Sequence, residues 1–137
     1  MTVCRGVRGA TVASANTSEA IVAATQELLL ALVEANTINV DDVACVFFTT
    51  TPDLTAQFPA LAARQLGWTD LALLCGHEMY VPDSLPLCIR VLLLWNTVLK
   101  PSEIVHCYLG DAARLRPERA SDRSSLEVPA AWQAVAI

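Results

Sequence analysis

The sequence predicts one folded domain of the α/β or α+β class, with a mixed β-sheet and two main helices on one face. Its 137 residues suffice for a single hydrophobic core. Short apolar or β-branched segments bounded by turn residues recur along the chain, and two segments with helical periodicity separate the first three of them. The resulting order, β-α-β-α-β-β-β, is typical of an α/β or α+β fold.

The first strand and the first helix follow from residue periodicity. Residues 2–12 alternate as a strand does, which places Arg8 on a face of small side chains. Asn16 and Glu19 form a capping-box pattern ahead of a helix over residues 20–36. Apolar side chains recur along this helix at the spacing of one face, and they are Ile21, Ala24, Leu28, Ala31 and Ala35.

The remaining elements are shorter. Residues 43–50 are β-branched and aromatic and predict a buried strand, after which Thr51-Pro52-Asp53 resembles a helix start. A second helix is expected over residues 58–66, ended by Gly67. Three further strands are expected over residues 71–75, 88–95 and 103–109, with a short additional edge strand over residues 113–117. Two helices cannot cover both faces of so apolar a sheet, so we expect a second subunit to cover the rest.

The C-terminal segment differs in composition from the rest of the chain. After Pro117 the sequence becomes polar and then small and apolar, which is typical of a flexible or docking tail. We therefore expect a folded domain over residues 1–117 and a tail over residues 118–137.

Composition excludes several classes of function. The formal net charge of −5 disfavours nucleic acid and anionic membranes as partners. No apolar run is long enough to span a bilayer, and the N-terminus has arginines and glycines where a signal peptide needs an apolar segment. Five cysteines without a C-x-x-C pair indicate reduced thiols. These observations predict a cytoplasmic protein.

Arg90 raises the question of what its charge meets. It is the only charged residue between Asp83 and Lys100, and a cation among leucines is costly to bury unless an anion meets it. Two interpretations remain open: an internal ion pair, with Glu78 as the nearest candidate, or a cavity in which Arg90 binds a ligand anion. Eight of the nine basic residues are arginine, which suits a small anionic ligand or, equally, reflects the arginine-rich composition of proteins from a GC-rich genome.

The common catalytic and cofactor motifs are absent from the sequence. There is no dinucleotide-binding glycine motif, P-loop, G-x-S-x-G or H-E-x-x-H, so we predict no cofactor. Cys75, His77 and Glu78 lie together, but a metal site would lack a partner cluster and a Cys/His nucleophile would lack an orienting residue. Cys75 and Glu78 are better interpreted as hydrogen-bonding wall residues. Tyr108, taken alone, would most often be half-buried with its hydroxyl at the surface.

Five separate blocks, taken together, resemble the AroH class of monofunctional chorismate mutases. They are RGVRGAT, TTPDLTAQFPALAARQLGW, LLCGHEM, CIRVLLL and HCYLGDAARLRP, in the family's order over about residues 3–117. The resemblance implies a homotrimer with a pseudo-α/β-barrel core and active sites at the subunit interfaces. It also implies an isomerase that converts chorismate to prephenate, in phenylalanine and tyrosine biosynthesis, without covalent, acid–base, metal or cofactor catalysis.

The resemblance further implies roles for individual residues. Arg90 would bind a substrate carboxylate and donate to the ether oxygen, which gains negative charge as its bond breaks. Arg8 with Tyr108 would hold the enolpyruvyl carboxylate, and Glu78 with Cys75 would bond the ring hydroxyl. The other expected substrate-binding residues line the apolar ring site or add positive potential at its mouth, and they are Phe58, Ala60, Arg64, Leu74, Leu115 and Arg116.

The sequence departs from the family pattern at several positions. Leu61 and Leu87 stand where members often carry basic residues, and Tyr80 and Asp83 replace a more usual acidic residue and a glycine. One residue is missing before Gly67 relative to some members. The missing charge at Leu61 is expected to weaken ground-state binding of a dianion, raising KM with kcat largely preserved.

Two other functions stay open on the sequence alone. The first is a non-catalytic trimeric small-molecule binder that kept the fold and lost the activity. The joint presence of Arg8, Glu78, Arg90 and Tyr108 argues against it, whereas Leu61 leaves room for it. The second is an imine or enamine deaminase of the similarly trimeric Rid family, whose arginine lies in a different sequence context.

Overall fold

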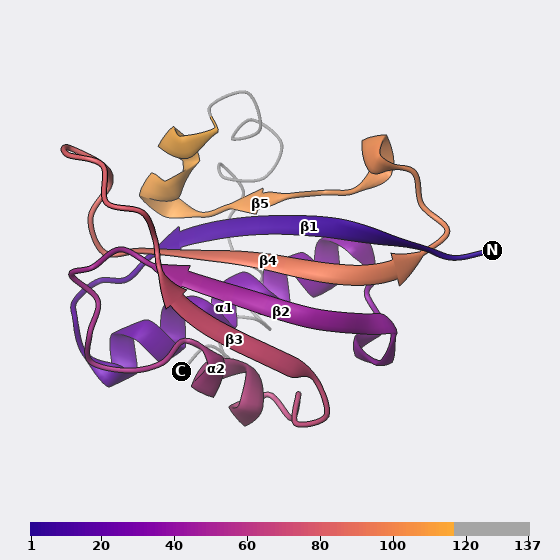
Figure 1. The fold of residues 1–137 in the computed structure, drawn as a ribbon, viewed down its shortest axis with the longest axis horizontal. Coiled ribbons are helices and arrows are strands. Elements are labelled where there is room, and N and C mark those ends of the chain that lie inside the picture. Colours follow the sequence, from indigo (N-terminus) through magenta and orange to yellow (C-terminus); the bar gives the residue numbers. More distant parts are fainter. Residues whose placement is uncertain (117–137) are drawn as a thin grey trace.

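The computed structural model describes residues 1–116, so the predicted tail over residues 118–137 lies outside the described residues. These residues form a five-stranded mixed sheet in the order β3-β2-β4-β1-β5 (Figure 1). The antiparallel centre consists of β2 (Val43–Thr50), β4 (Cys88–Thr97) and β1 (Val3–Val12). At the edges, β3 (Ala72–His77) runs parallel to β2, and the short β5 (Cys107–Tyr108) runs parallel to β1. The predicted fold class is confirmed.

Both helices pack on one face of this sheet, as predicted. In Figure 1, α1 (Ser18–Asn36) lies behind the sheet, and α2 (Ala60–Gln65) packs beside α1 next to β3. Side chains alternate between the two faces of each strand, and Val7, Val46 and Leu93 point toward the helices, where they are completely buried. The main hydrophobic core therefore lies between the helices and this face.

Gly9 lets α1 approach β1 closely. A Cβ atom at this position would lie 2.9 Å from Cδ1 of Leu28 and 3.0 Å from Cδ1 of Leu32. It would also lie 3.2 Å from the backbone carbonyl oxygen of Cys107. Since side chains do not pack this tightly, a glycine at this position sets the distance between helix and sheet.

The start of α1 differs from the prediction. Thr17, not Asn16, is the N-cap residue, and its Oγ1 accepts a hydrogen bond from a backbone N–H of the first turn (3.2 Å). Asn16 Oδ1 instead accepts from the backbone N–H groups of Thr55 and Ala56, at 2.9 and 3.0 Å. Asn16 therefore links the loop before α1 to the loop that leads into Phe58.

The strand expected over residues 103–109 is much shorter in the structure. Pro101–Glu103 form a 3-10 turn, and only the two residues of β5 pair with β1. Just before this pairing, the backbone N–H of Arg8 donates to Nδ1 of His106 at 2.9 Å. A side chain thus takes the place of a strand carbonyl at this edge, which residue periodicity does not reveal.

Two further predictions are wrong. The edge strand expected over residues 113–117 is absent, because Gly110–Leu115 form a 3-10 helix. Thr51-Pro52-Asp53 starts no helix and lies in a turn. The other strands and both helices are confirmed, with ends that differ by one or two residues. Gly67, which was expected to end the second helix, has a left-handed φ of 89°.

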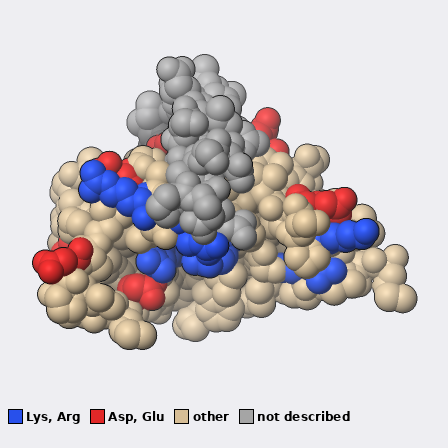
Figure 2. All heavy atoms as spheres, turned by 90° about the horizontal axis from the view of Figure 1, so that it is seen from above, with Lys and Arg blue, Asp and Glu red and all other residues tan. Residues whose placement is uncertain are grey.

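The helices and the visible surface agree with the composition, which predicts neither a membrane-spanning segment nor a basic surface. No helix among residues 1–116 combines the length and the apolarity that crossing a membrane requires. On the face drawn in Figure 2, basic side chains lie in several separate places, with acidic side chains beside some of them, and most of the visible surface is uncharged.

No α-helix among the described residues packs on the second face of the sheet, although the 3-10 helix Gly110–Leu115 covers its β1 side, where Ala10 packs against Ala112. Arg8, Thr49 and Arg90 lie on this open face and line a cavity on it. Phe47 and Leu92 line the same cavity and remain 38% and 39% exposed. An apolar sheet face that stays this exposed is typical of a surface covered by another molecule.

Candidate active site

Four of the expected catalytic and binding residues lie around one cavity on the open face. Arg8, Glu78, Arg90 and Tyr108 line a cavity of about 250 Å³, which we call the arginine cavity. They come from β1, the end of β3, β4 and β5. Because the register of the sheet fixes the backbone of all these strands, it also fixes how their side chains converge.

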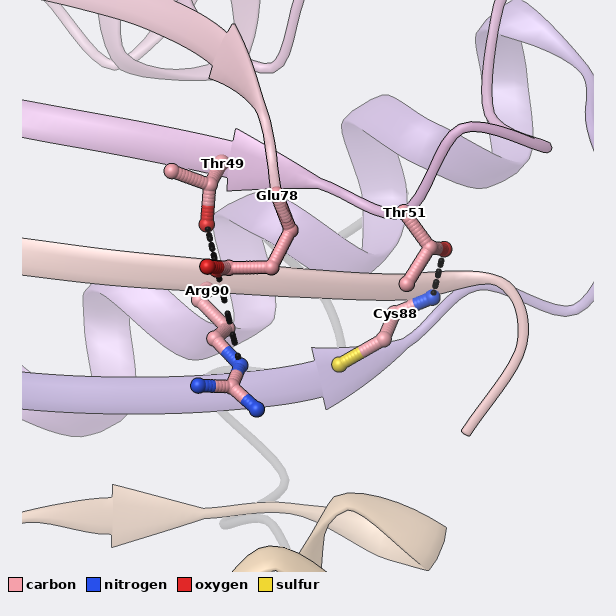
Figure 3. Close-up of polar contacts among 5 residues, drawn as sticks. All are labelled: Thr49, Thr51, Glu78, Cys88 and Arg90. Carbon is pink, nitrogen blue, oxygen red and sulfur yellow. Dashed lines mark hydrogen bonds and ion pairs between the residues drawn. The ribbon is translucent and has the colours of Figure 1, made fainter. Parts of the chain in front are cut away.

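Arg90 has a protein partner, but the contact is loose. Its Nε lies 3.8 Å from Oε2 of Glu78, and the two side chains are 39% and 34% exposed (Figure 3). A buried ion pair would be shielded from water and held by shorter hydrogen bonds. The ion-pair interpretation is therefore right about the partner and wrong about the burial. The guanidinium keeps N–H donors that can meet a ligand anion in the cavity.

Tyr108 is more buried than expected. The residue is 2% exposed, and its hydroxyl has no hydrogen-bond partner among residues 1–116. The interpretation that places this hydroxyl at the surface is wrong. An unpaired hydroxyl in a protein interior carries a free-energy penalty of about 1–3 kcal/mol. A ligand that accepts its hydrogen bond in the arginine cavity would remove that penalty.

Glu78 is held by a residue that sequence analysis missed. Oγ1 of Thr49 donates to Oε2 of Glu78 at 2.7 Å, and the backbone N–H of Glu78 donates to the carbonyl of Thr50 at 2.7 Å (Figure 3). A threonine within a β-branched segment signals only a strand, so no sequence pattern distinguishes Thr49. Knowing that β2 lies beside β4 would have placed it next to Arg90.

Glu78 and Arg90 also border a second cavity, of about 280 Å³, that contains Cys88 and Leu115. Burial raises the pKa of the Cys88 thiol, although the charge of Arg90 and a hydrogen bond from it act in the opposite direction. Figure 3 shows the Cys88 sulfur directed toward the guanidinium. At neutral pH this thiol is therefore an uncharged neighbour of Arg90.

Most of the other expected residues lie at the β3 edge of the sheet, whereas Leu115 borders the second cavity beside Arg90. Phe58 and Cys75 line a third cavity, of about 400 Å³, which we call the edge cavity. Burial raises the pKa of the Cys75 thiol, and the backbone N–H of Ala60 and the charge of Arg64 partly oppose this shift, so these groups lie close to the thiol. Cys75 pairs with the buried Phe48 and packs against the core on the helix side of the sheet.

The structure thus divides the expected site residues between two places on one chain. The side chain of Ala60 is buried in the core, Arg64 is exposed on α2, and Leu74 is 62% exposed on β3. Arg116 is half-buried at the end of the described chain. His77 also lines the edge cavity and shares a hydrogen bond with Thr50 Oγ1 (3.1 Å). Within residues 1–116, no group of three His, Cys, Asp or Glu side chains could hold a metal ion.

A turn fixes the start of β4 and hence the place of Arg90. Oγ1 of Thr51 accepts from the backbone N–H of Cys88 at 3.0 Å and donates to Oδ1 of Asp53. Oδ2 of Asp53 accepts from the backbone N–H of Leu87 at 2.9 Å. Leu87 has a φ of 54°, a left-handed conformation that leucine disfavours. The hydrogen bond from Leu87 therefore helps to hold a strained residue three positions before Arg90.

Comparison with known proteins identifies the family. The sequence model of the family described as chorismate mutase type I matches residues 4–119. The chain belongs to this family. The chorismate mutase AroH of Thermus thermophilus is 51% identical over 115 residues, which are 83% of this chain and 94% of that protein. The chorismate mutase AroH of Bacillus subtilis is 40% identical over 115 residues, 83% of this chain and 91% of that protein.

The fold is that of the family as well. A solved structure of chorismate mutase from Clostridium thermocellum matches with a TM-score of 0.79 and 47% identity, covering 80% of this chain and 98% of that one. The predicted family and the predicted isomerase activity are therefore confirmed. Asp83, which stands where the resemblance implies a glycine, has a φ of 63°, a conformation that glycine adopts freely and aspartate tolerates.

We expect the Thr51–Asp53 turn to make stability depend on pH. Burial alone would raise the pKa of Asp53, but hydrogen bonds from Thr51 and from backbone N–H groups outweigh it and lower the pKa. A carboxyl whose pKa is lower in the folded than in the unfolded state stabilises the fold above its unfolded pKa. This contribution is lost as pH falls through the folded pKa.

Asp53→Asn should therefore unfold at a lower urea concentration than the wild type at neutral pH. The difference should shrink in acid, as the pH falls through the lowered pKa of the native carboxyl and that carboxyl becomes protonated too. Urea midpoints measured across this range test the prediction, with Asp70→Asn as the control, because Asp70 is an exposed aspartate outside the turn. A midpoint difference that does not change with pH would contradict it.

Proposed function

We propose that this chain rearranges chorismate to prephenate in the arginine cavity. The observation that carries the proposal is the convergence on one cavity of two arginines, a glutamate held by a neighbouring hydroxyl, and a buried hydroxyl without a partner. Chorismate is a dicarboxylate whose ether oxygen gains negative charge as the reaction proceeds. Fixed donors and cations in a cavity of low polarity are what such a transition state requires.

The reaction requires no nucleophile, acid or base from the protein. One C–O bond breaks and one C–C bond forms as the enolpyruvyl group migrates within the same molecule, so no group is passed to or from the protein. The protein therefore contributes by holding a reactive conformer and by stabilising charge. In our proposal Arg90 binds a carboxylate and donates to the ether oxygen, Arg8 and Tyr108 hold the enolpyruvyl carboxylate, and Glu78 accepts a hydrogen bond from the ring hydroxyl.

We further propose that the chain acts as a homotrimer in which a second copy completes each site. Phe58 and Leu74, which are expected to wall the ring, are 66% and 62% exposed in the single chain. The open face of the sheet is apolar, and the edge cavity opens separately from the arginine cavity. The edge cavity of one copy, set against the arginine cavity of the next, would enclose the substrate and exclude water, which strengthens every charged contact.

The proposed site belongs to a protein of the cytoplasm. Cys4, Cys45, Cys75 and Cys88 are free thiols, which agrees with a reducing compartment.

Arg90→Gln should lower turnover by roughly 10²–10³-fold, as expected for the loss of one donor to an oxyanion. The loss of chorismate's ultraviolet absorbance measures the rate directly. Arg5→Gln is the matched control, because Arg5 is an arginine of the same sheet that does not line the arginine cavity. Its Nε donates instead to the carbonyl of Leu99. A folded Arg90→Gln variant with turnover near that of the wild type would rule out the role of Arg90.

Mixing two inactive variants tests the shared site. Phe58→Asp places a negative charge beside the dianion and should inactivate the half of the site that the edge cavity supplies. Arg90→Gln should inactivate the half that the arginine cavity supplies. If each site combines halves from two copies, equal random mixing in a trimer should restore about a quarter of the sites. The two variants are unfolded together, refolded and assayed. A mixture no more active than its separately refolded components would show that each chain builds its whole site alone.

Leu61→Lys should lower KM several-fold with little change in kcat. Leu61 is half-buried on α2, near Phe58, and a cation there would attract the substrate dianion in the ground state and the transition state alike. Steady-state kinetics at low ionic strength test this prediction. Val98→Lys adds the same charge at an exposed position and is the control. An unchanged KM would mean that another cation already serves the ring carboxylate.

A further inference from the structure

We propose that Thr49 is a positioning residue that keeps Glu78 from closing onto Arg90. Its hydroxyl would thereby keep the guanidinium open to the substrate anion. This inference deepens the proposed function of the arginine cavity and rests on it.

The sheet register brings the three side chains together. Thr49 on β2 lies directly opposite Arg90 on β4 and, on its other side, opposite Gly76 on β3. Because Gly76 has no side chain, the open face beside Thr49 is empty at this position, and a Cβ atom added there would meet nothing within 4 Å. Two residues later the chain is held by the hydrogen bond from Glu78 N–H to the Thr50 carbonyl. The Glu78 carboxylate therefore reaches back over Thr49 toward Arg90, as Figure 3 shows.

One carboxylate oxygen faces two donors, and the distances show which donor holds it. Oε2 of Glu78 lies 2.7 Å from Oγ1 of Thr49 and 3.8 Å from Nε of Arg90. A hydroxyl at 2.7 Å makes a full, charge-assisted hydrogen bond. A guanidinium nitrogen at 3.8 Å is beyond hydrogen-bond distance, and with both side chains about a third exposed, water screens the attraction. The hydroxyl, not the charge, sets the position of the carboxylate.

Removing the hydroxyl should reverse this order. A carboxylate beside an arginine prefers the direct, two-point salt bridge that the guanidinium fork offers. Without Thr49 as a donor, Glu78 is expected to move the short remaining distance and form that bridge. The substrate carboxylate would then have to displace Glu78 before it could bind. The loss should therefore appear mainly as a higher KM.

Thr49→Val and Thr49→Ser separate this role from a structural one. Valine keeps the β-branched shape and removes only the donor, so we expect KM to rise roughly 10-fold or more with a smaller change in kcat, as for one lost hydrogen bond to a charged group. Serine keeps the donor and should stay within about 3-fold of the wild type. If Thr49 served only to stabilise the strand, the order would be opposite, because valine is the better strand former.

A double-mutant cycle with Glu78→Gln tests the mechanism. Glutamine is neutral and gains little from Arg90, so Thr49→Val should have almost no further effect on KM in that background. Effects that multiply in the double variant would overturn the proposal. So would a Thr49→Val variant with the KM of the wild type.

Two further measurements keep the outcomes distinct. Thr97→Val removes a hydroxyl at the far end of β4 and should leave KM unchanged, and thermal melting of each variant confirms that it is folded. A wild-type protein that leaves chorismate unchanged would overturn the proposed function and this inference with it. An active wild type with an unaffected Thr49→Val variant would overturn this inference alone.

Discussion

Two α-helices can cover only one face of this five-stranded sheet, and the rest of the structure depends on that constraint. Alternation along β1, β2 and β4 sends Val7, Val46 and Leu93 under the helices. The same alternation sends Arg8 and Arg90 to the open face, where they share a cavity. A slip of one residue in β4 would exchange these faces and drive a guanidinium into an apolar core. The register is therefore a condition for function as well as for stability.

The state of Arg90 follows from its place on the open face. Under the helices it would need a fully satisfied ion pair, and in open water its attraction for an anion would be weak. Arg90 is half-exposed beside a carboxylate that is already hydrogen-bonded to Thr49. It therefore avoids the full free-energy cost of burial and also keeps its N–H donors. In the proposed trimer, the second copy that covers the cavity would supply the desolvation. The attraction between Arg90 and an anion would then become strong only when a ligand is enclosed with it, which is the condition under which electrostatic catalysis is effective.

How far the sequence could predict this structure depends on how local each signal is. The repeating patterns of α1, β2 and β4 are local and were predicted to within one or two residues. Predictions were wrong where a side chain takes over a backbone role. Thr17 caps α1 while Asn16 bonds a distant loop, and His106 accepts a hydrogen bond next to the shortened β5. The contacts of Asn16 and His106 join residues far apart in the chain and leave no periodicity to read.

Some residues of the candidate site could likewise be predicted from the sequence, and others could not. Arg90 with Glu78 could be predicted as partners because a lone cation in an apolar segment requires one, and the family resemblance supplied Arg8 and Tyr108. Neither argument reaches Thr49, whose contact with Glu78 spans 29 residues, because a threonine in a strand is ordinary. The separation of the edge cavity from the arginine cavity was missed as well, although Cys75 and Glu78 are three residues apart, a spacing that sends side chains of an extended strand to opposite faces. The family resemblance assigned both residues to one ring hydroxyl, whereas alternation along the strand separates them.

A reaction that needs no nucleophile, acid or base leaves no catalytic motif, so its enzyme is recognised by where charges are held. Misplacing a donor by about 1 Å can remove most of its effect on rate, whatever its chemical identity. Residues that never touch the substrate then share in the function. Thr49 restrains the carboxylate beside Arg90, and the hydrogen bonds of Thr51 and Asp53 fix where β4 begins. A homologue with the same arginines but without these supports would keep the charges and the fold. It would bind the dianion less tightly, because Glu78 would then compete with the substrate for Arg90, so these supporting side chains decide whether the same charges stay available to a ligand.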